Sequence, residues 1–111
     1  MAEKPVRWVG SSLDDLRAFP GDARRIAGHQ LYLVQLGLDP SDRTLMPSIG
    51  SGVAEIRIHT GLEHRVFYIA KFSEGIYVLH AFQKKTRKTP RREIELARHR
   101  LHEVIRMRTV R

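Results

Sequence analysis

The sequence predicts a single α+β domain over residues 1–111, with a mainly antiparallel sheet and the element order β-α-α-β-β-β-α. Three observations lead to this prediction. Apolar residues recur at helical spacing in the first half, short apolar segments joined by tight turns follow in the second half, and the chain ends in a long amphipathic segment. A chain of 111 residues is long enough for one core and too short for two.

The first half of the chain is predicted to form one strand and two helices. Residues 5–9 alternate enough for a short strand. Ser12 is a candidate N-cap for a short helix that Pro20 ends. Asp22 is a candidate N-cap for a second helix over residues 23–36. The apolar residues that give this second helix its spacing are Ile26, Leu33 and Val34.

The second half is predicted to begin with a loop and to continue as three strands. Residues 38–52 contain two prolines and two glycines, which is typical of a loop. Residues 54–60 alternate strictly between apolar and polar side chains, residues 65–72 are almost continuously apolar, and residues 76–82 form the third strand. Because the connections are short turns, neighbouring strands should be antiparallel.

The last predicted element is a helix that follows a basic loop. Thr89 is a candidate N-cap and Pro90 the first helical residue, a position that proline favours. Its apolar face is predicted to consist of Ile94, Ala97, Leu101, Val104 and Ile105.

Two arginines of the first predicted hairpin are expected to face each other. Arg57 and Arg65 are equidistant from Gly61, where the chain turns, so they are candidates to lie opposite each other on one face. Like charges in that position are unfavourable unless an anion lies between them. The anion is either a bound ligand or a neighbouring carboxylate, Glu55 or Glu63, in an ordinary surface ion pair.

The positive charge of the chain is concentrated at its end. Residues 84–111 contain 11 Lys+Arg and 3 Asp+Glu, a net +8, whereas residues 1–83 contain nine of each and are neutral. Such a polarised surface is typical of a polyanion binder, although a solvated basic helix or one that pairs with an acidic protein has the same composition.

Several classes of protein are excluded by composition. The chain has no cysteine, so a disulfide framework and a thiolate zinc site are excluded. His99 and His102 are three residues apart on a helix, but the surrounding arginines disfavour a metal ion there. We expect no metal and no cofactor. The N-terminus lacks the apolar region of a signal peptide, and no apolar run could span a membrane, so we expect a cytoplasmic protein.

Three segments of the second half match short motifs at a characteristic spacing. Residues 52–57 read Gly-Val-Ala-Glu-Ile-Arg and match G-x-x-E-[LI]-R, and residues 63–68 match x-x-R-V-[FL]-Y. Residues 79–90 match L-x-x-F-x-K-K-x-x-K-T-P. Together they resemble the HigB-like, phage-derived branch of the RelE/ParE toxin superfamily, and the resemblance covers about residues 52–104.

The resemblance implies a toxin of a type II toxin–antitoxin pair that cuts mRNA on the ribosome, inhibits translation and arrests growth. This metal-independent endoribonuclease chemistry uses the 2′-hydroxyl of the substrate to attack the adjacent phosphate, and guanidinium groups suit the charge that develops there. The partners implied are the mRNA and a cognate antitoxin that commonly contains a helix-turn-helix domain. No membrane or small-molecule cofactor is implied.

The resemblance, together with the positions of the residues on the predicted strands, supplies the candidate site residues. Those expected to contact the reacting phosphate or to move protons are Arg57, Arg65, Lys84, Lys85, His59 and Tyr68. Among them His59 shares a face with Arg57 and has a suitable pKa for an acid or a base, whereas Tyr68 is either a structural or a catalytic aromatic. The expected RNA contacts are Phe82, Arg87, Lys88, Arg91 and Arg92, and Phe82 either stacks on a base or belongs to the core.

Two other functions fit the same fold. ParE-like relatives of this superfamily inhibit DNA gyrase and lack the ribonuclease residues, so a non-nuclease toxin with a protein target is one alternative. A non-catalytic RNA- or ribosome-binding module, anchored by its basic end, is the other.

Overall fold

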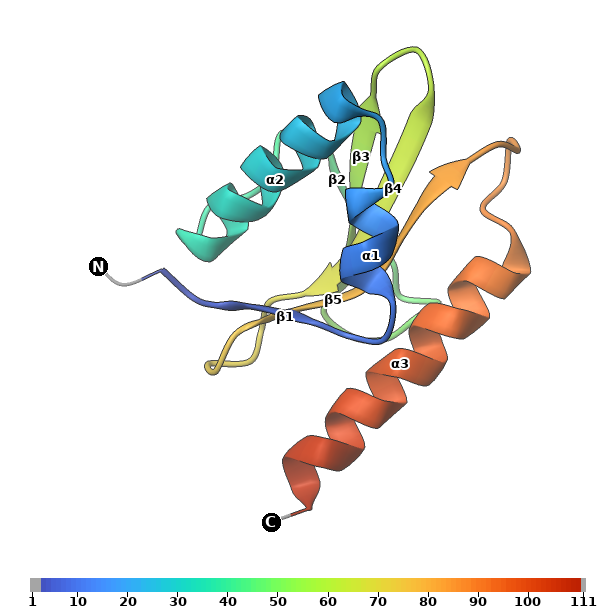
Figure 1. Ribbon diagram of the computed structural model, residues 1–111. Coiled ribbons are helices and arrows are strands. Elements are labelled where there is room, and N and C mark those ends of the chain that lie inside the picture. Colours follow the sequence, from blue (N-terminus) through green and yellow to red (C-terminus); the bar gives the residue numbers. More distant parts are fainter. Residues whose placement is uncertain (1–2, 111) are drawn as a thin grey trace.

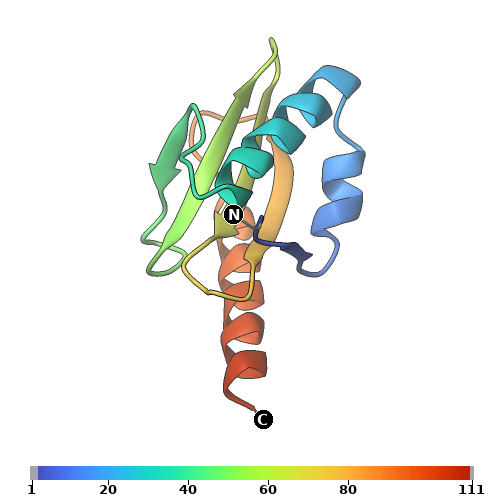
Figure 2. The same ribbon diagram turned by 90° about the vertical axis from the view of Figure 1, so that its left-hand side faces the viewer.

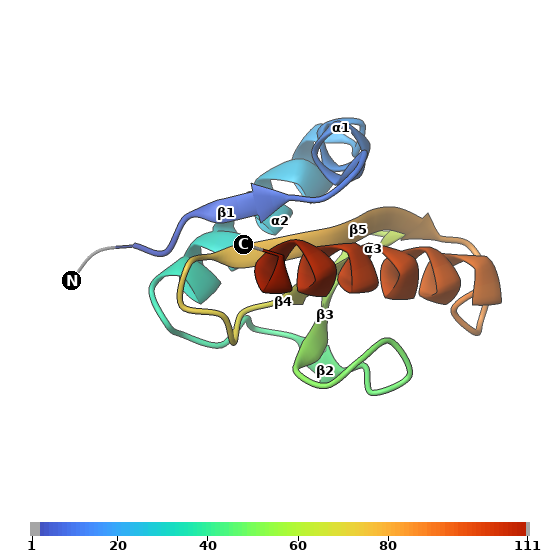
Figure 3. The same ribbon diagram turned by 90° about the horizontal axis from the view of Figure 1, so that it is seen from below.

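The computed structural model describes residues 3–110, which form five strands and three helices around one sheet (Figure 1). In chain order these elements are β1 (Val6–Trp8), α1 (Ser12–Arg17), α2 (Gly21–Gln35), β2 (Arg43–Leu45), β3 (Val53–His59), β4 (Glu63–Ile69), β5 (Ile76–Lys84) and α3 (Arg91–Thr109). The sheet order is β1-β5-β4-β3-β2. Figure 3 shows β1 and β2 at opposite sides of the sheet.

The α+β fold with its mainly antiparallel sheet is confirmed. β3 pairs antiparallel with β4, and β4 pairs antiparallel with β5, as the short turns predicted. β1 pairs with β5 in parallel, with Val6 beside Ile76. The parallel pair is possible because α1, α2 and the three following strands separate β1 from β5 along the chain.

One strand was not predicted. Residues 38–52, predicted to be a loop, contain β2, which pairs antiparallel with β3. Pairing satisfies backbone groups at the edge of the sheet, for example where the N–H of Met46 donates to the carbonyl of Val53 (2.9 Å). A three-residue strand is too short to show a period of two, and prolines on both sides concealed it.

Two helix starts differ from the prediction by one or two residues. α2 begins at Gly21, with Pro20 as its N-cap, and the carboxylate of Asp22 accepts a hydrogen bond from the N–H of Ala23 instead of capping the helix. Ser12 is not an N-cap but a buried residue inside α1. Its hydroxyl donates to the carbonyl of Val78 and joins α1 to β5 (3.1 Å).

The start and one face of α3 also differ from the prediction. Pro90 is the N-cap and Arg91 the first helical residue, so the helix begins one residue later than expected. Ile105, predicted to be on the apolar face of α3, is 43% exposed. Ile26, predicted to be on the apolar face of α2, is 37% exposed. Ile105 is exposed because the C-terminal part of α3 extends beyond the sheet and has no strand to cover it, as Figure 2 shows.

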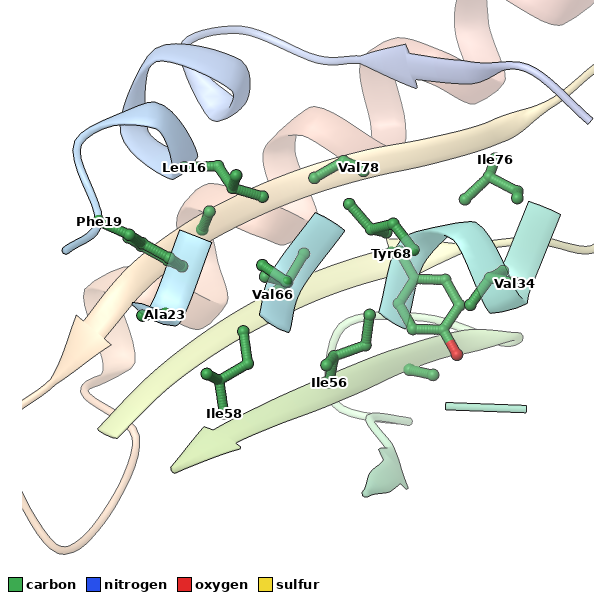
Figure 4. Packing of buried hydrophobic residues seen from close by; sticks show 14 residues of the cluster. Leu16, Phe19, Ala23, Val34, Ile56, Ile58, Val66, Tyr68, Ile76 and Val78 are labelled. Atoms are coloured by element: carbon green, nitrogen blue, oxygen red, sulfur yellow. The ribbon is translucent and has the colours of Figure 1, made fainter. Parts of the chain in front are cut away.

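The sheet separates two apolar clusters. One lies between the sheet and the helices α1 and α2, and it includes Leu16, Leu31, Ile56, Val66 and Val78 (Figure 4). The other lies between the sheet and α3, and it includes Val53, Phe67, Leu79, Leu101 and Val104. The central strands are therefore covered on both faces, which explains the nearly continuous apolar sequence of β4.

Candidate functional site

The candidate site lies on the sheet face that α3 covers, at the end of the β3–β4 hairpin where α3 no longer reaches. Cross-strand pairing arranges its side chains in three rows, Glu55–Phe67–His80, Arg57–Arg65–Phe82 and His59–Glu63–Lys84. The first row borders the apolar cluster under α3 and the third lies at the open end of the hairpin. This gradient from apolar to charged side chains defines the site.

Arg57 and Arg65 are paired directly across the two strands, as the position of Gly61 predicted. Both guanidinium groups contact the carboxylate of Glu55, which is only 4% exposed. The distance from the Nε of Arg57 is 3.2 Å and that from the Nε of Arg65 is 3.6 Å. Glu55 therefore supplies the anion that two facing arginines require, and the ion-pair alternative raised by the sequence describes the geometry.

The two arginines differ in exposure. The side chain of Arg65 is 8% exposed, and its Nη1 donates to Glu63 (2.9 Å) and to the carbonyl of His64 (3.1 Å). The side chain of Arg57 is 40% exposed. Within residues 3–110, no hydrogen-bond partner is found for its two terminal nitrogens. Arg57 can accept an anion from solvent without breaking an existing bond, whereas Arg65 is largely shielded from solvent and is tied to two carboxylates.

His59 lies between two carboxylates. Its Nδ1 is 2.8 Å from Glu63 and its Nε2 is 2.7 Å from Asp42, the residue before β2. The hydrogen bond with Asp42, followed by that with Glu63, raises the pKa of His59 above its ordinary 6.5. The hydrogen bond with His59, and then that with Arg65, lowers the pKa of Glu63. Both shifts favour a charged pair.

These contacts join six residues into one series of alternating charges. It runs Asp42, His59, Glu63, Arg65, Glu55, Arg57, and each member contacts the next. We call this series the ionic chain. With His59 protonated it contains three positive and three negative groups. Arg57 lies at one end of the ionic chain, and its side chain is more exposed than that of Arg65.

The predicted basic loop borders the ionic chain. Lys84, paired across the strands with Glu63, donates from its Nζ to the carbonyl of Arg87 (2.6 Å) and so holds the loop. Lys85, Arg87 and Lys88 are exposed. Arg91 and Arg92 are exposed in the first turn of α3, where the helix dipole also favours an anion.

Phe82 packs in the core, which favours the structural one of the two alternatives that the sequence left open for this residue. It is 8% exposed, meets Phe67 edge-on at a centroid distance of 5.2 Å and stacks on His80 at 5.0 Å. His80 is fixed in turn by a 2.9 Å hydrogen bond with Glu93 of α3. These contacts hold the Phe82 ring in the cluster under α3.

Tyr68 lies on the opposite face of the sheet from Arg57 and Arg65, which favours the structural interpretation of this residue over the catalytic one. Its ring packs beside Ile56 and Val34 in the cluster under α2 (Figure 4). Burial raises the pKa of its hydroxyl to about 12, which further disfavours proton transfer. It is the structural aromatic of the motif.

Sequence reasoning missed Asp42. Its link to His59 depends on β2, which places residue 42 beside β3, and β2 had no sequence signal. Glu55 and Glu63 had been considered only as neutralising partners, and their positions on the alternating strands predicted that geometry correctly.

Neither a metal nor a membrane feature is found in the described residues. In the part of the chain from 3 to 110, no group of three or more acidic, histidine or cysteine side chains could hold a metal ion. No helix among the same residues is long and apolar enough to cross a membrane.

The fold and the site define a small α+β protein with an arginine-bearing sheet face beside a basic loop. The family model of the phage-derived Gp49-like proteins (DUF891) matches residues 14–102, from α1 through most of α3, and the chain belongs to this family. The match includes all six residues of the ionic chain, and the family is associated with toxin–antitoxin systems. A comparison with curated proteins gives no match.

Proposed function

We propose that this protein is a RelE/HigB-like toxin that cuts mRNA on the ribosome without a metal ion and thereby stops translation. The observation that carries the proposal is the exposed end of the ionic chain, where Arg57 keeps two unpaired nitrogens beside a loop rich in lysine and arginine. The Gp49-like family membership supports the toxin class, and the motif resemblance supports the ribonuclease chemistry.

Arg57 is the group best placed to bind the reacting phosphate. A guanidinium presents two parallel N–H donors that match two phosphate oxygens, and Glu55 already fixes its Nε. In the reaction the 2′-oxygen of the RNA bonds to phosphorus while the bond from phosphorus to the 5′-oxygen breaks. Arg57 would stabilise the charge on the remaining phosphate oxygens. Arg65, being buried, would act through Glu55 and Glu63 rather than by direct contact.

Two protons move in this reaction, and His59 suits the donor. The 2′-hydroxyl loses a proton and the departing 5′-oxygen gains one. The carboxylates on both ring nitrogens raise the pKa of His59, which favours its protonated form at neutral pH. To donate, the ring must exchange one of these carboxylates for the leaving oxygen. His59 is 52% exposed, so this exchange requires no opening of the core.

The exposed cations beyond the chain would hold the rest of the RNA. Lys85, Arg87, Lys88, Arg91 and Arg92 lie in one continuous segment from the end of β5 into α3. Contacts of this kind are electrostatic and independent of sequence. An antitoxin encoded with the protein would be expected to cover this basic surface, and the place of action would be the cytoplasm.

One observation favours the non-nuclease alternative. Two of the residues expected to bind substrate already have protein partners. Arg65 contacts Glu55 and Glu63. Lys84 donates to the carbonyl of Arg87. A toxin that binds a protein such as DNA gyrase, or a module that only anchors RNA, would need no free catalytic groups there.

The test compares Arg57→Ala with Arg25→Ala after induction in cells. Arg25 is an exposed arginine of α2, so its replacement removes the same charge from the other side of the sheet. We expect wild type and Arg25→Ala to arrest growth and to produce new mRNA 5′ ends, and Arg57→Ala to do neither. Growth arrest by the wild type with intact mRNA would refute the ribonuclease and favour a protein target.

A further inference from the structure

Asp42 is fixed to β3 by two bonds. Its backbone carbonyl accepts the N–H of Arg57 at 3.0 Å, and its carboxylate lies 2.7 Å from the Nε2 of His59. The two bonds reach alternate residues of one strand, so the position of Asp42 relative to both is determined by the backbone. Although its side chain is 42% exposed, it is therefore held in place rather than free to rotate.

Both ring nitrogens of His59 act as donors in this arrangement. A carboxylate accepts hydrogen bonds but cannot donate them, so a ring between Asp42 and Glu63 satisfies both contacts only as an imidazolium. The causes of the raised pKa agree, because the Asp42 hydrogen bond is the largest and the Glu63 hydrogen bond is the second.

The charge of His59 affects the whole face. The charged groups around it are Asp42 before β2, Arg57 on its own strand, Glu63 and Arg65 on β4, and Lys84 on β5. When His59 is protonated, the ionic chain has equal numbers of positive and negative groups. When His59 loses its proton, one negative charge is left in excess beside the site that Arg57 offers to an anion.

We infer that Asp42 is a positioning residue that holds His59 as a cation up to a higher pH and thereby sets the pH at which the binding of RNA phosphate at Arg57 weakens. The identity of the anion rests on the proposed function, whereas the hold of Asp42 on His59 does not. For one unit of charge about one Debye length from the anion, Coulomb's law gives roughly a two- to fivefold change in anion affinity.

The experiment compares Asp42→Asn with Asp39→Asn. Asp39 belongs to the same loop and is 80% exposed, and its 3.7 Å contact with Arg43 lies outside the ionic chain, so it is a matched control. The pKa of His59 is measured by NMR of the imidazole, with His59→Gln to assign the signal. Binding of a 2′-O-methyl RNA oligonucleotide of mixed sequence, which cannot be cut, is measured over the same pH range at constant salt.

We expect Asp42→Asn to move the titration of His59 to lower pH and to move the weakening of RNA binding with it, while Asp39→Asn behaves like wild type. In His59→Gln the affinity should change less over this pH range than it does in wild type. An unchanged His59 titration in Asp42→Asn would overturn the inference, whatever the RNA data show. So would RNA affinity that does not follow the His59 titration.

A different result would refute the proposed function. If wild-type protein produces no cut mRNA in cells while the Asp42→Asn shift occurs as expected, the ribonuclease assignment is refuted and the role of Asp42 stands. If mRNA is cut and the His59 titration is the same in Asp42→Asn and wild type, the ribonuclease assignment stands and the role of Asp42 is refuted.

Discussion

The clearest consequence of the ionic chain is that two arginines facing each other on one sheet should have very different effects on stability. Replacing Arg65 by alanine leaves the carboxylate of Glu55, 4% exposed, with Arg57 as its remaining partner. Breaking one side of a buried ion pair costs about 3–5 kcal/mol, and the contact that remains places Arg65→Ala near the lower end, at about 3 kcal/mol.

Arg57→Ala should cost far less. Its side chain is 40% exposed, and Glu55 keeps its contact with the buried Arg65, so the surface value of about 0–1 kcal/mol applies. A difference of about 2–3 kcal/mol is a large part of the total stability of a small domain and corresponds to roughly 8–18 °C in melting temperature.

Thermal and urea unfolding of the purified variants measure this difference, with Arg25→Ala as a control for the loss of a surface charge. Adding Glu55→Gln to Arg65→Met should recover part of the loss of the single replacements, because no buried charge is then left unpaired. Equal destabilisation by Arg57→Ala and Arg65→Ala would refute the assignment of different environments. It would also mean that activity lost by either variant could not be separated from unfolding.

Three further predictions concern Phe82, Tyr68 and the pair of Glu74 with Arg108. Phe82→Ala should destabilise the protein by about 3–5 kcal/mol, because it leaves a cavity beside Phe67. Phe82→Leu should remain toxic. A Phe82→Leu protein that folds but is not toxic would support a role of Phe82 in base stacking. Tyr68→Phe should leave growth inhibition unchanged, since the hydroxyl lies on the far face of the sheet, and an inactive folded variant would contradict this. The Arg108 guanidinium holds the pKa of Glu74 at about 2, below the usual 4.5, so this pair stabilises the fold above about pH 4.5 and its contribution is lost as the pH falls toward 2. Urea unfolding at several pH values should show a smaller acid loss in Glu74→Gln, and an equal loss would refute the contribution of the pair.

The sequence was sufficient for the hairpin because its information is local. Strict alternation before Gly61 determined which side chains share a face, and equal distances from the turn determined that residues 57 and 65 are opposite. The same reasoning placed the basic loop at the end of β5. These predictions needed no knowledge of the rest of the molecule.

Contacts between distant segments were not predictable in this way. β2 has three residues and obtains its hydrogen bonds from β3, so neither its existence nor the position of Asp42 follows from a local pattern. Burial is similar. Phe82 has the spacing of a side chain on the functional face, and that spacing is correct, but Phe67, His80 and the start of α3 cover it.

The two arginines show the limit of residue type as evidence of function. They share a face of the sheet and the carboxylate of Glu55, yet Arg65 lies toward the covered middle of the sheet and Arg57 on the neighbouring, more open strand. A guanidinium in the first position stabilises the site from within, because it is buried and contacts Glu55, Glu63 and the His64 carbonyl. One in the second position keeps donors for a ligand. The distinction depends on the order of the strands and on where α3 begins, and it decides which arginine can meet a phosphate.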